Sequence, residues 1–415
     1  MKNKRFDLKK ITEKEGFRSA SASLLSVLIG VTAGAVIIML IALLSSEISF
    51  KNGIEGVKLL FFGVFSKGRN PAGELLFGFN GTNAGNMLFR ATPVIMTGLS
   101  VSFAFKAGLF NIGTPGQYLI GTAATLITAL SIPSDVVPPV IIWLLSFLSG
   151  MLFGALWGII PGIFRAYLNI NEVLSSIMTN WIAANLVTLI FENSSFRNGA
   201  ESGKVGYIMK TSSNGVATAT LGLDRIFEGS QINSGILVAC LFAVIVYVVI
   251  SKTVFGFELR TCGSNRYAAE YAGIKSKSRI VSVMALSGAL SGAGAALYYL
   301  SGNTEFFWST YQSLPAEGFR GIPIALLALS NPIGVIFSGT FMSALSIAGQ
   351  QLKNFTSYSE YLTDIIIAII VYVSAFSLII KNLLSKRSSF RLKSTSFPFN
   401  LQKKEIEAED EKEAD

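Results

Sequence analysis

Long apolar runs without charged residues, separated by short charged stretches, dominate the chain. About twenty apolar residues cross a bilayer as a helix, so this pattern predicts an all-α, polytopic membrane protein. The uncharged runs are 19–46, 91–105, 107–134, 136–164, 173–191, 229–251, 280–304, 321–352 and 365–380. The run 321–352 is too long for one span, and Ser330-Asn331-Pro332 interrupts it. We therefore expect two short helices that meet at a turn there.

The distribution of basic residues predicts about ten transmembrane helices with both termini in the cytoplasm. Both tails are rich in Lys and Arg, and basic segments stay on the cytoplasmic side of a membrane. Two cytoplasmic termini require an even number of spans, so the interrupted run counts as two. Ten spans also place Lys106, Arg165 and the loop 252–279 inside.

This topology divides the chain into three parts. Residues 1–18 form a basic cytoplasmic tail, 19–384 a transmembrane domain, and 385–415 a cytoplasmic tail. The last tail is a charge run without apolar periodicity, so we expect it to be disordered. The two sizeable outer loops are 47–87 and 192–232. We expect no separate catalytic domain.

The amino-acid composition excludes several classes of function. The chain is 51% hydrophobic and 14% charged, with a net charge of +9. Because the basic residues flank apolar runs, membrane topology explains the charge, and we expect a lipid bilayer and no nucleic acid as partner. Histidine is absent, and Cys240 and Cys262 are isolated, so we expect no metal site and no histidine-based catalysis. Gly203-Lys204 lacks the rest of a phosphate-binding loop, so we expect no ATP cofactor in this chain.

A break near the start of the apolar run 107–134 is a candidate for a polar path. Glycine and proline interrupt the pattern between Lys106 and Leu119, and broken backbone at membrane depth lies inside protein or beside water. Asn111 and Gln117 would line such a path. The alternative is a loop on the inner face that joins two spans, with Asn111 capping the next helix.

The span that starts at Asn171 carries a second set of polar residues. Glu172, Ser176, Thr179 and Asn180 fall on one helical face. The helix dipole favours Glu172 at a helix start, whereas Asn180 lies deeper and needs a partner or a water-lined cavity. No charged residue is expected in the middle of any span, which disfavours ion-coupled transport.

The inner loop 252–279 is the most distinctive soluble feature. Ser264 or Asn265 can cap a short helix through Tyr271, and Gly273 can end it. The helix has a small apolar face of Tyr267, Ala268 and Tyr271. It either lies on the membrane surface or docks into a groove of another protein.

Here the sequence resembles the permease subunits of bacterial ABC importers, in the family for branched-chain amino acids, simple sugars and nucleosides. The segments that carry the resemblance are, in order, Thr97-Gly98-Leu99, Gly108-Leu109-Phe110-Asn111-Ile112-Gly113, Gly116-Gln117, Asn171-Glu172-Val173, Ser176-Ile177-Met178, Asn180, Ala272-Gly273-Ile274, Glu317-Gly318-Phe319-Arg320-Gly321-Ile322, Ala325-Leu326-Leu327 and Asn331-Pro332. The first two asparagine motifs are most similar to the nucleoside or simple-sugar branch. Pro115 stands where the family more often has an acidic residue, so the role of that acid is not carried over.

The resemblance implies a multi-pass permease of the bacterial plasma membrane that is not itself an enzyme. A separate cytoplasmic ABC ATPase would use ATP, an extracytoplasmic binding lipoprotein would deliver the small-molecule substrate, and a second permease, identical or related, would complete the pore. The coupling residues would be Gly256, Arg260, Gly263, Asn265, Ala268, Ala269 and Gly273. The substrate pathway would include Asn111, Gln117, Glu172 and Asn180.

Two other functions stay open. An ion-coupled secondary transporter would need a carboxylate, and Glu172 and Asp364 lie at span ends. An intramembrane enzyme would lack the usual acid–base pair. For a nucleoside, the amides supply partners for the hydroxyl groups, and three neighbouring aromatic residues, Phe306, Phe307 and Trp308, offer a surface for the base, although such residues also anchor proteins at the membrane interface.

Overall fold

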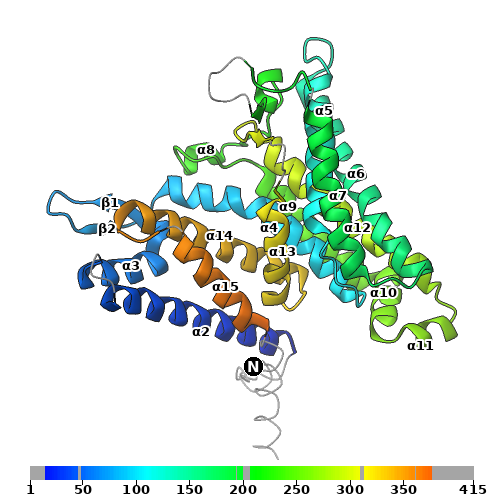
Figure 1. Ribbon diagram of the computed structural model, residues 1–415, viewed down its shortest axis with the longest axis horizontal. Coiled ribbons are helices and arrows are strands. Elements are labelled where there is room, and N and C mark those ends of the chain that lie inside the picture. Colours follow the sequence, from blue (N-terminus) through cyan, green and yellow to red (C-terminus); the bar gives the residue numbers. More distant parts are fainter. Residues whose placement is uncertain are drawn as a thin grey trace, which may run out of the picture.

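The computed structural model describes residues 15–44, 48–192, 194–199, 206–308, 313–359 and 361–375. The predicted tail 385–415 and most of the tail 1–18 lie outside these ranges. Within them the protein is mostly helical (Figure 1). The long helices are α2 Glu15–Leu44, α4 Gly81–Lys106, α5 Thr114–Ser131, α6 Pro139–Tyr167, α7 Glu172–Glu192, α9 Gly235–Lys252, α12 Ser276–Tyr299 and α14 Pro332–Phe355.

Seven of the described helices are long and apolar enough to cross a membrane, namely α2, α4, α6, α7, α9, α12 and α14. The polytopic all-α class is therefore confirmed. The other predicted spans correspond to α5, to α13 (Ala316–Leu327) and to α15 (Tyr361–Ala375), which are shorter or less apolar. The count of ten spans stays a prediction.

The start of α4 corrects one sequence-based boundary. The helix begins at Gly81, where the Asn80 side chain accepts from Asn83 N, and not at Ala91. Arg90 therefore lies inside a membrane-crossing helix, and Glu317 and Arg320 lie within α13. The expectation that no span contains an internal charge was wrong, because reading the sequence from charge to charge ends a span at every arginine.

The interrupted run forms two helices, as predicted. Asn331 caps α14, since its Oδ1 accepts from Ile333 N at 3.0 Å and Gly334 N at 3.3 Å. Leu329 and Ser330 precede it with φ angles of 49° and 55°. Two consecutive non-glycine residues in the left-handed region are strained, so this turn stores conformational energy between α13 and α14.

Helix α12 lies at the centre of the bundle because small residues let its neighbours approach closely. A Cβ atom on Gly288 would lie 2.1 Å from the Gly154 carbonyl oxygen, and one on Gly292 would lie 2.1 Å from the Gly150 carbonyl oxygen. The backbones of α12 and α6 are thus in contact, which is how membrane helices associate without a hydrophobic driving force. Helices α4 and α5 pack against the same helix.

The shorter elements cap the two ends of the bundle. Helix α3 (Phe50–Phe62), the turn η1 (Gly63–Phe65) and the hairpin β1 (Ser66–Arg69) with β2 (Leu75–Phe77) precede α4. Between α7 and α9 lie β3 (Tyr207–Ile208), η2 (Thr211–Asn214) and α8 (Leu223–Ile226). Strand β3 pairs with β4 (Phe306–Phe307), which follows α12. The hairpin and α8 lie on the opposite side of the molecule from α10 (Val254–Ser264) and α11 (Arg266–Tyr271) in Figure 1.

Candidate functional site

The break before α5 is held by two side-chain amides that bond to each other. Asn111 Nδ2 donates to Gln117 Oε1 at 2.9 Å, and Gln117 Nε2 donates to Asn111 Oδ1 at 3.2 Å. Asn111 Oδ1 also accepts from Gly113 N at 3.0 Å. Both side chains are fully buried. The N-cap of α5 is Gly113, not Asn111, so the alternative that Asn111 caps this helix is wrong.

Asn180 joins the same break from α7. Its Oδ1 accepts from Gly116 N at 2.9 Å, and its Nδ2 donates to the carbonyl oxygen of Ile112 at 3.0 Å. The predicted polar face of α7 is buried at Ser176, Thr179 and Asn180. Asn111 and Asn180 thus bond to backbone groups of residues 112–116 that would otherwise be left unpaired, and Gln117 holds Asn111 in place.

The segment 107–113 folds back along α4, so α5 begins at membrane depth. The Ser287 hydroxyl, in the middle of α12, donates to the Ser100 carbonyl oxygen of α4. One turn further along α12, Ser291 Oγ donates to the carbonyl oxygen of Thr114 at 2.8 Å. The first residue of α5 is therefore level with the centre of a membrane-crossing helix. Irregular backbone at this depth is tolerated because it is enclosed by protein.

Glu172 lies apart from the amide cluster. Its Oε2 is 3.2 Å from Arg165 Nε, and this ion pair joins the end of α6 to the start of α7. The Glu172 side chain is 12% exposed and that of Arg165 is 34% exposed. A pair at this exposure stabilises the protein by at most about 1 kcal/mol, and it neutralises the carboxylate that a coupling ion would need.

The three neighbouring aromatic residues mostly face the protein. Phe306 is buried against Phe191, whereas Phe307 is 51% exposed. Trp308 Nε1 donates to the Thr188 carbonyl oxygen at 3.0 Å, and the Arg197 guanidinium lies 4.1 Å from the centre of its ring. Phe307 is therefore the exposed aromatic surface of this set.

The inner loop contains the predicted helix and a second one that sequence reasoning missed. Asn265 caps α11 by accepting from Ala268 N at 3.0 Å, and Gly273 follows the helix with a φ of 81°. Tyr267 and Tyr271 are 79% and 98% exposed. The predicted cap, end and apolar face of α11 are thus confirmed, and the face is unoccupied within the part of the chain that is described.

Helix α10 holds α11 against the end of the bundle. A Cβ atom on Gly256 would lie 2.1 Å from the Val249 carbonyl oxygen, so only glycine permits the sharp bend out of α9. Glu258 Oε2 lies 2.5 Å from Arg279 Nε, which ties α10 to α12. Arg260 Nε donates to the Gly256 carbonyl oxygen at 3.4 Å, within α10 itself.

Two ionisable groups of the inner loop have shifted pKa values. A hydrogen bond from Ser276, followed by the nearby Arg266, lowers the pKa of the Glu270 carboxyl. Partial burial, with the Glu258 carboxylate nearby, raises the pKa of the Cys262 thiol. Cys262 is thus a weaker nucleophile than a free cysteine. Ala269 of α11 is buried, so it anchors the helix while Ala268 faces outward.

The inner loop contacts the broken segment directly. A Cβ atom on Gly263 would lie 2.6 Å from the carbonyl carbon of Ala107. On the other side, Gly108 has a φ of 70° and would place a Cβ atom 2.9 Å from Gly263 Cα. The two backbones therefore touch, at the point where α10 ends and the non-helical segment 107–113 begins.

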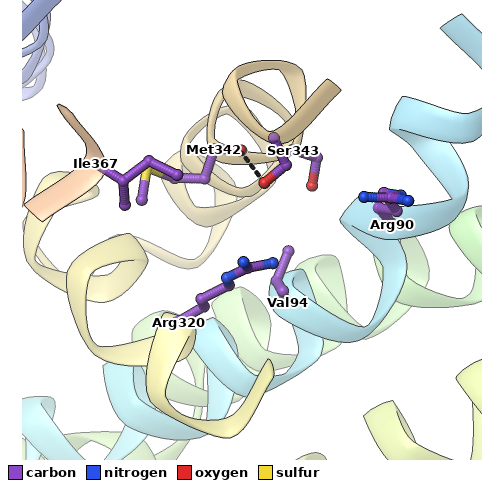
Figure 2. A pocket seen from close by; sticks show the side chains of 7 residues that line it. Arg90, Val94, Arg320, Met342, Ser343 and Ile367 are labelled. Carbon is purple, nitrogen blue, oxygen red and sulfur yellow. Dashed lines mark hydrogen bonds between the residues drawn. The ribbon is translucent and has the colours of Figure 1, made fainter. Parts of the chain in front are cut away.

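Sequence reasoning missed a charged group within the membrane region. Arg90 of α4 and Arg320 of α13 line a recess with residues of α14 and α15 (Figure 2). The amide of Gln350, with its oxygen turned toward Arg90, accepts from Nη1 at 3.1 Å and Nη2 at 2.7 Å. The signal that could have found Arg90 is Asn80, which is a good N-cap residue ten positions upstream.

A match to a protein-family model decides what kind of protein carries these features. Residues 83–375 match the family described as branched-chain amino acid transport system / permease component. The chain belongs to this permease family. It is a multi-pass permease of the cytoplasmic membrane and not an enzyme, and permeases of ABC transporters work with an ATPase and a binding protein.

Individual relatives of the permease cover most of its length. It is 32% identical over 365 residues, 88% of this chain and 95% of the relative, to the guanosine ABC transporter permease protein NupP of Bacillus subtilis (strain 168). It is 33% identical over 307 residues, 74% of this chain and 83% of the relative, to the nucleoside ABC transporter permease protein NupB of Lactococcus lactis subsp. cremoris (strain MG1363).

A third relative carries a different substrate name. The permease is 31% identical over 292 residues, 69% of this chain and 74% of the relative, to the glucose ABC transporter permease protein TsgB13 of Haloferax volcanii. No solved structure matches the chain.

Proposed function

We propose that this permease imports nucleosides into the cytoplasm, driven by a separate ATPase. The likeness to permeases named for guanosine and for nucleosides, over most of the chain, carries the proposal. A simple sugar is the second candidate, favoured by the relative named for glucose. The chain supplies the path through the membrane, and ATP is bound and hydrolysed by the partner subunit.

The docking of the ATPase takes place at α11. Its exposed face of Tyr267, Ala268 and Tyr271 projects from the end of the bundle that carries the basic loop 252–279. An amphipathic helix of this kind fits a groove in a partner. The competing interpretation, a helix lying on lipid, would require the tyrosines to sit in the headgroup region.

Movement of the docked helix reaches the membrane through the contact between Gly263 and Gly108. Because the two backbones touch, α10 cannot shift toward the bundle without displacing the segment 107–113. In that segment, Asn111 bonds to Gln117 of α5, and the Ile112 carbonyl oxygen accepts from Asn180 of α7. A step driven by ATP would therefore move two helices that meet at membrane depth.

The full transporter needs further parts. Ten spans, with the shorter or less apolar helices α5, α13 and α15 included, would leave both termini in the cytoplasm. A second permease, identical or related, would complete the pore, and a binding lipoprotein would deliver substrate to the outer elements α3, β1–β2 and α8. Asn111, Gln117 and Asn180 shape the path by holding its irregular backbone, and Glu172 holds α7 against α6.

Uptake in membrane vesicles tests the proposal. Vesicles that contain the permease, its partner permease, the ATPase and the binding protein are supplied with ATP and with radiolabelled guanosine, uridine or glucose in turn. We expect ATP-dependent uptake of the nucleosides and none of glucose. Uptake of glucose alone would favour the sugar candidate, and nucleoside uptake that needs an ion gradient but no ATP would make the protein a secondary carrier.

A further inference from the structure

Two arginines face one recess between α4 and α13. Arg90 lies nine residues after the start of α4, which is about 14 Å along the helix. Arg320 lies in the second turn of α13. Figure 2 shows Arg320 reaching from α13 toward Val94 of α4, with Arg90 and Ser343 farther along the recess.

The charges in this group do not cancel. Arg90 interacts electrostatically with Arg320, Glu317 and Tyr298, so two guanidinium groups and one carboxylate contribute charge here. An arginine within a membrane-crossing helix is costly and therefore rare. Gln350 accepts hydrogen bonds from the Nη1 and Nη2 atoms of Arg90. No hydrogen bond of the Arg320 side chain is found among the described residues. Such a costly group, only partly paired, indicates a binding function.

Tyr118 and Tyr298 belong to the same electrostatic group as Glu317. Tyr118 of α5 is 1% exposed, its hydroxyl has no hydrogen-bond partner within the described residues, and it interacts electrostatically with Glu317. The rings of Phe89 and Tyr298 stack with their centres 5.5 Å apart. The Glu317 carboxylate therefore interacts with both Tyr118 and Arg90.

The recess is closed in this conformation, and the fold provides a way to open it. Its free volume is about 10 Å³, enough for about one water molecule. The walls belong to α4 on one side and to α13, α14 and α15 on the other. Helix α13 is joined to α14 by the strained turn at Leu329 and Ser330, where a hinge can release strain. The recess would therefore widen when α13 moves away from α4.

We propose that Arg90 and Arg320 recognise the acceptor edge of a purine nucleoside, the O6 and N7 atoms of a 6-oxopurine base, as it passes through the membrane. This inference rests on the nucleoside import proposed above. A guanidinium group donates two parallel hydrogen bonds to the adjacent O6 and N7 acceptors, as arginine does with guanine in DNA.

Uptake of paired substrates by arginine variants tests this site. Vesicles with the complete transporter carry the wild type, Arg90→Lys or Arg320→Lys, because lysine keeps the charge but loses the two-pronged donor. Arg225→Lys, at an exposed arginine of α8, is the matched control. Uptake of guanosine is compared with that of 7-deazaguanosine, which lacks N7, and of uridine. The binding protein is the same in every vesicle, so a changed ratio comes from the permease.

We expect the KM for guanosine to rise about tenfold in Arg320→Lys, since one bidentate pair contributes a discrimination of about that size or more. The rise should be smaller in Arg90→Lys, because both Nη atoms of Arg90 already donate to Gln350. The uptake of uridine should stay within about twofold of the wild type, and the preference for guanosine over 7-deazaguanosine should disappear. Arg225→Lys should behave as the wild type.

Two outcomes would overturn the assignment. The first is an unchanged guanosine to 7-deazaguanosine ratio in both recess variants, and the second is an equal loss of all three substrates with normal amounts of permease in the membrane. If Arg90→Lys fails to insert, Arg320→Lys alone decides, because it breaks no hydrogen bond found in the described chain. A wild type that takes up no nucleoside would refute the proposed function instead.

Discussion

Gly108 and Gly263 touch backbone to backbone, although they are 155 positions apart in the chain. The contact connects the end of α10, in the inner loop, with the first residues of the broken segment before α5. No side chain lies between them, so a displacement of one backbone pushes directly on the other. The two glycines therefore connect the proposed docking region outside the membrane with the irregular backbone inside it.

Gly263→Ala tests this contact. The added Cβ would lie 2.6 Å from the Ala107 carbonyl carbon, and overpacking of this kind costs about 1–3 kcal/mol. We expect the variant to reach the membrane and bind the ATPase, while ATP-driven uptake falls about tenfold. Uptake and ATPase activity are measured together in vesicles.

Gly199→Ala is the matched control, because no atom of the described residues, chain neighbours aside, lies within 4 Å of a Cβ atom at that position. It should transport normally. If Gly263→Ala also transports at the wild-type rate, the contact does not transmit the movement.

Asn180→Ala tests the amide cluster. The change removes the acceptor of Gly116 N and the donor to the Ile112 carbonyl oxygen, and each buried backbone group left unpaired costs about 1–3 kcal/mol. We expect weaker transport with normal membrane insertion. Uptake kinetics and the amount of permease in the membrane are measured for both variant and wild type.

Asn185→Ala, on the same helix, provides the comparison. Asn185 is exposed, and within the described residues its side chain bonds to the Trp181 carbonyl oxygen of its own helix. Its replacement should leave uptake unchanged. Wild-type kinetics in Asn180→Ala would remove Asn180 from the machinery that shapes the path.

Glu172→Gln distinguishes an ATP-driven permease from an ion-coupled carrier. Glu172 is paired with Arg165 at 3.2 Å, so we expect a loss of no more than about 1 kcal/mol in stability and uptake within about threefold of the wild type. Uptake is measured with ATP present, before and after the ion gradient is collapsed. If the variant is inactive, or if wild-type uptake stops with the gradient, Glu172 carries the coupling ion.

The sequence predicted those features that depend on neighbouring residues. Asn331-Pro332 combines a cap with a proline at the first helical position, and Asn265 stands three positions before the amide that it caps. Both signals are local, so helices α14 and α11 begin where they were expected to begin. The break before α5 was also recognisable, because glycine and proline destabilise a helix wherever they occur.

Features that depend on distant contacts were not predictable in this way. Asn180 was singled out as a polar residue at depth, but its bond to Gly116 joins positions 64 residues apart. Arg90 marked the end of a span when each charge was read as a boundary. Its partner Gln350 belongs to another helix, and only the folded chain brings the two together.

The central claim, that an ATPase docked on α11 drives substrate through this chain, is tested most directly with Ala268→Arg. Vesicles with the complete transporter carry this variant, the wild type or Ser278→Arg, which adds the same charge at an exposed position of α12. ATP-dependent uptake of radiolabelled guanosine and co-purification of the ATPase are measured on the same samples. We expect both to be lost in Ala268→Arg and retained in the control. Normal uptake by Ala268→Arg with the ATPase still bound would contradict the account.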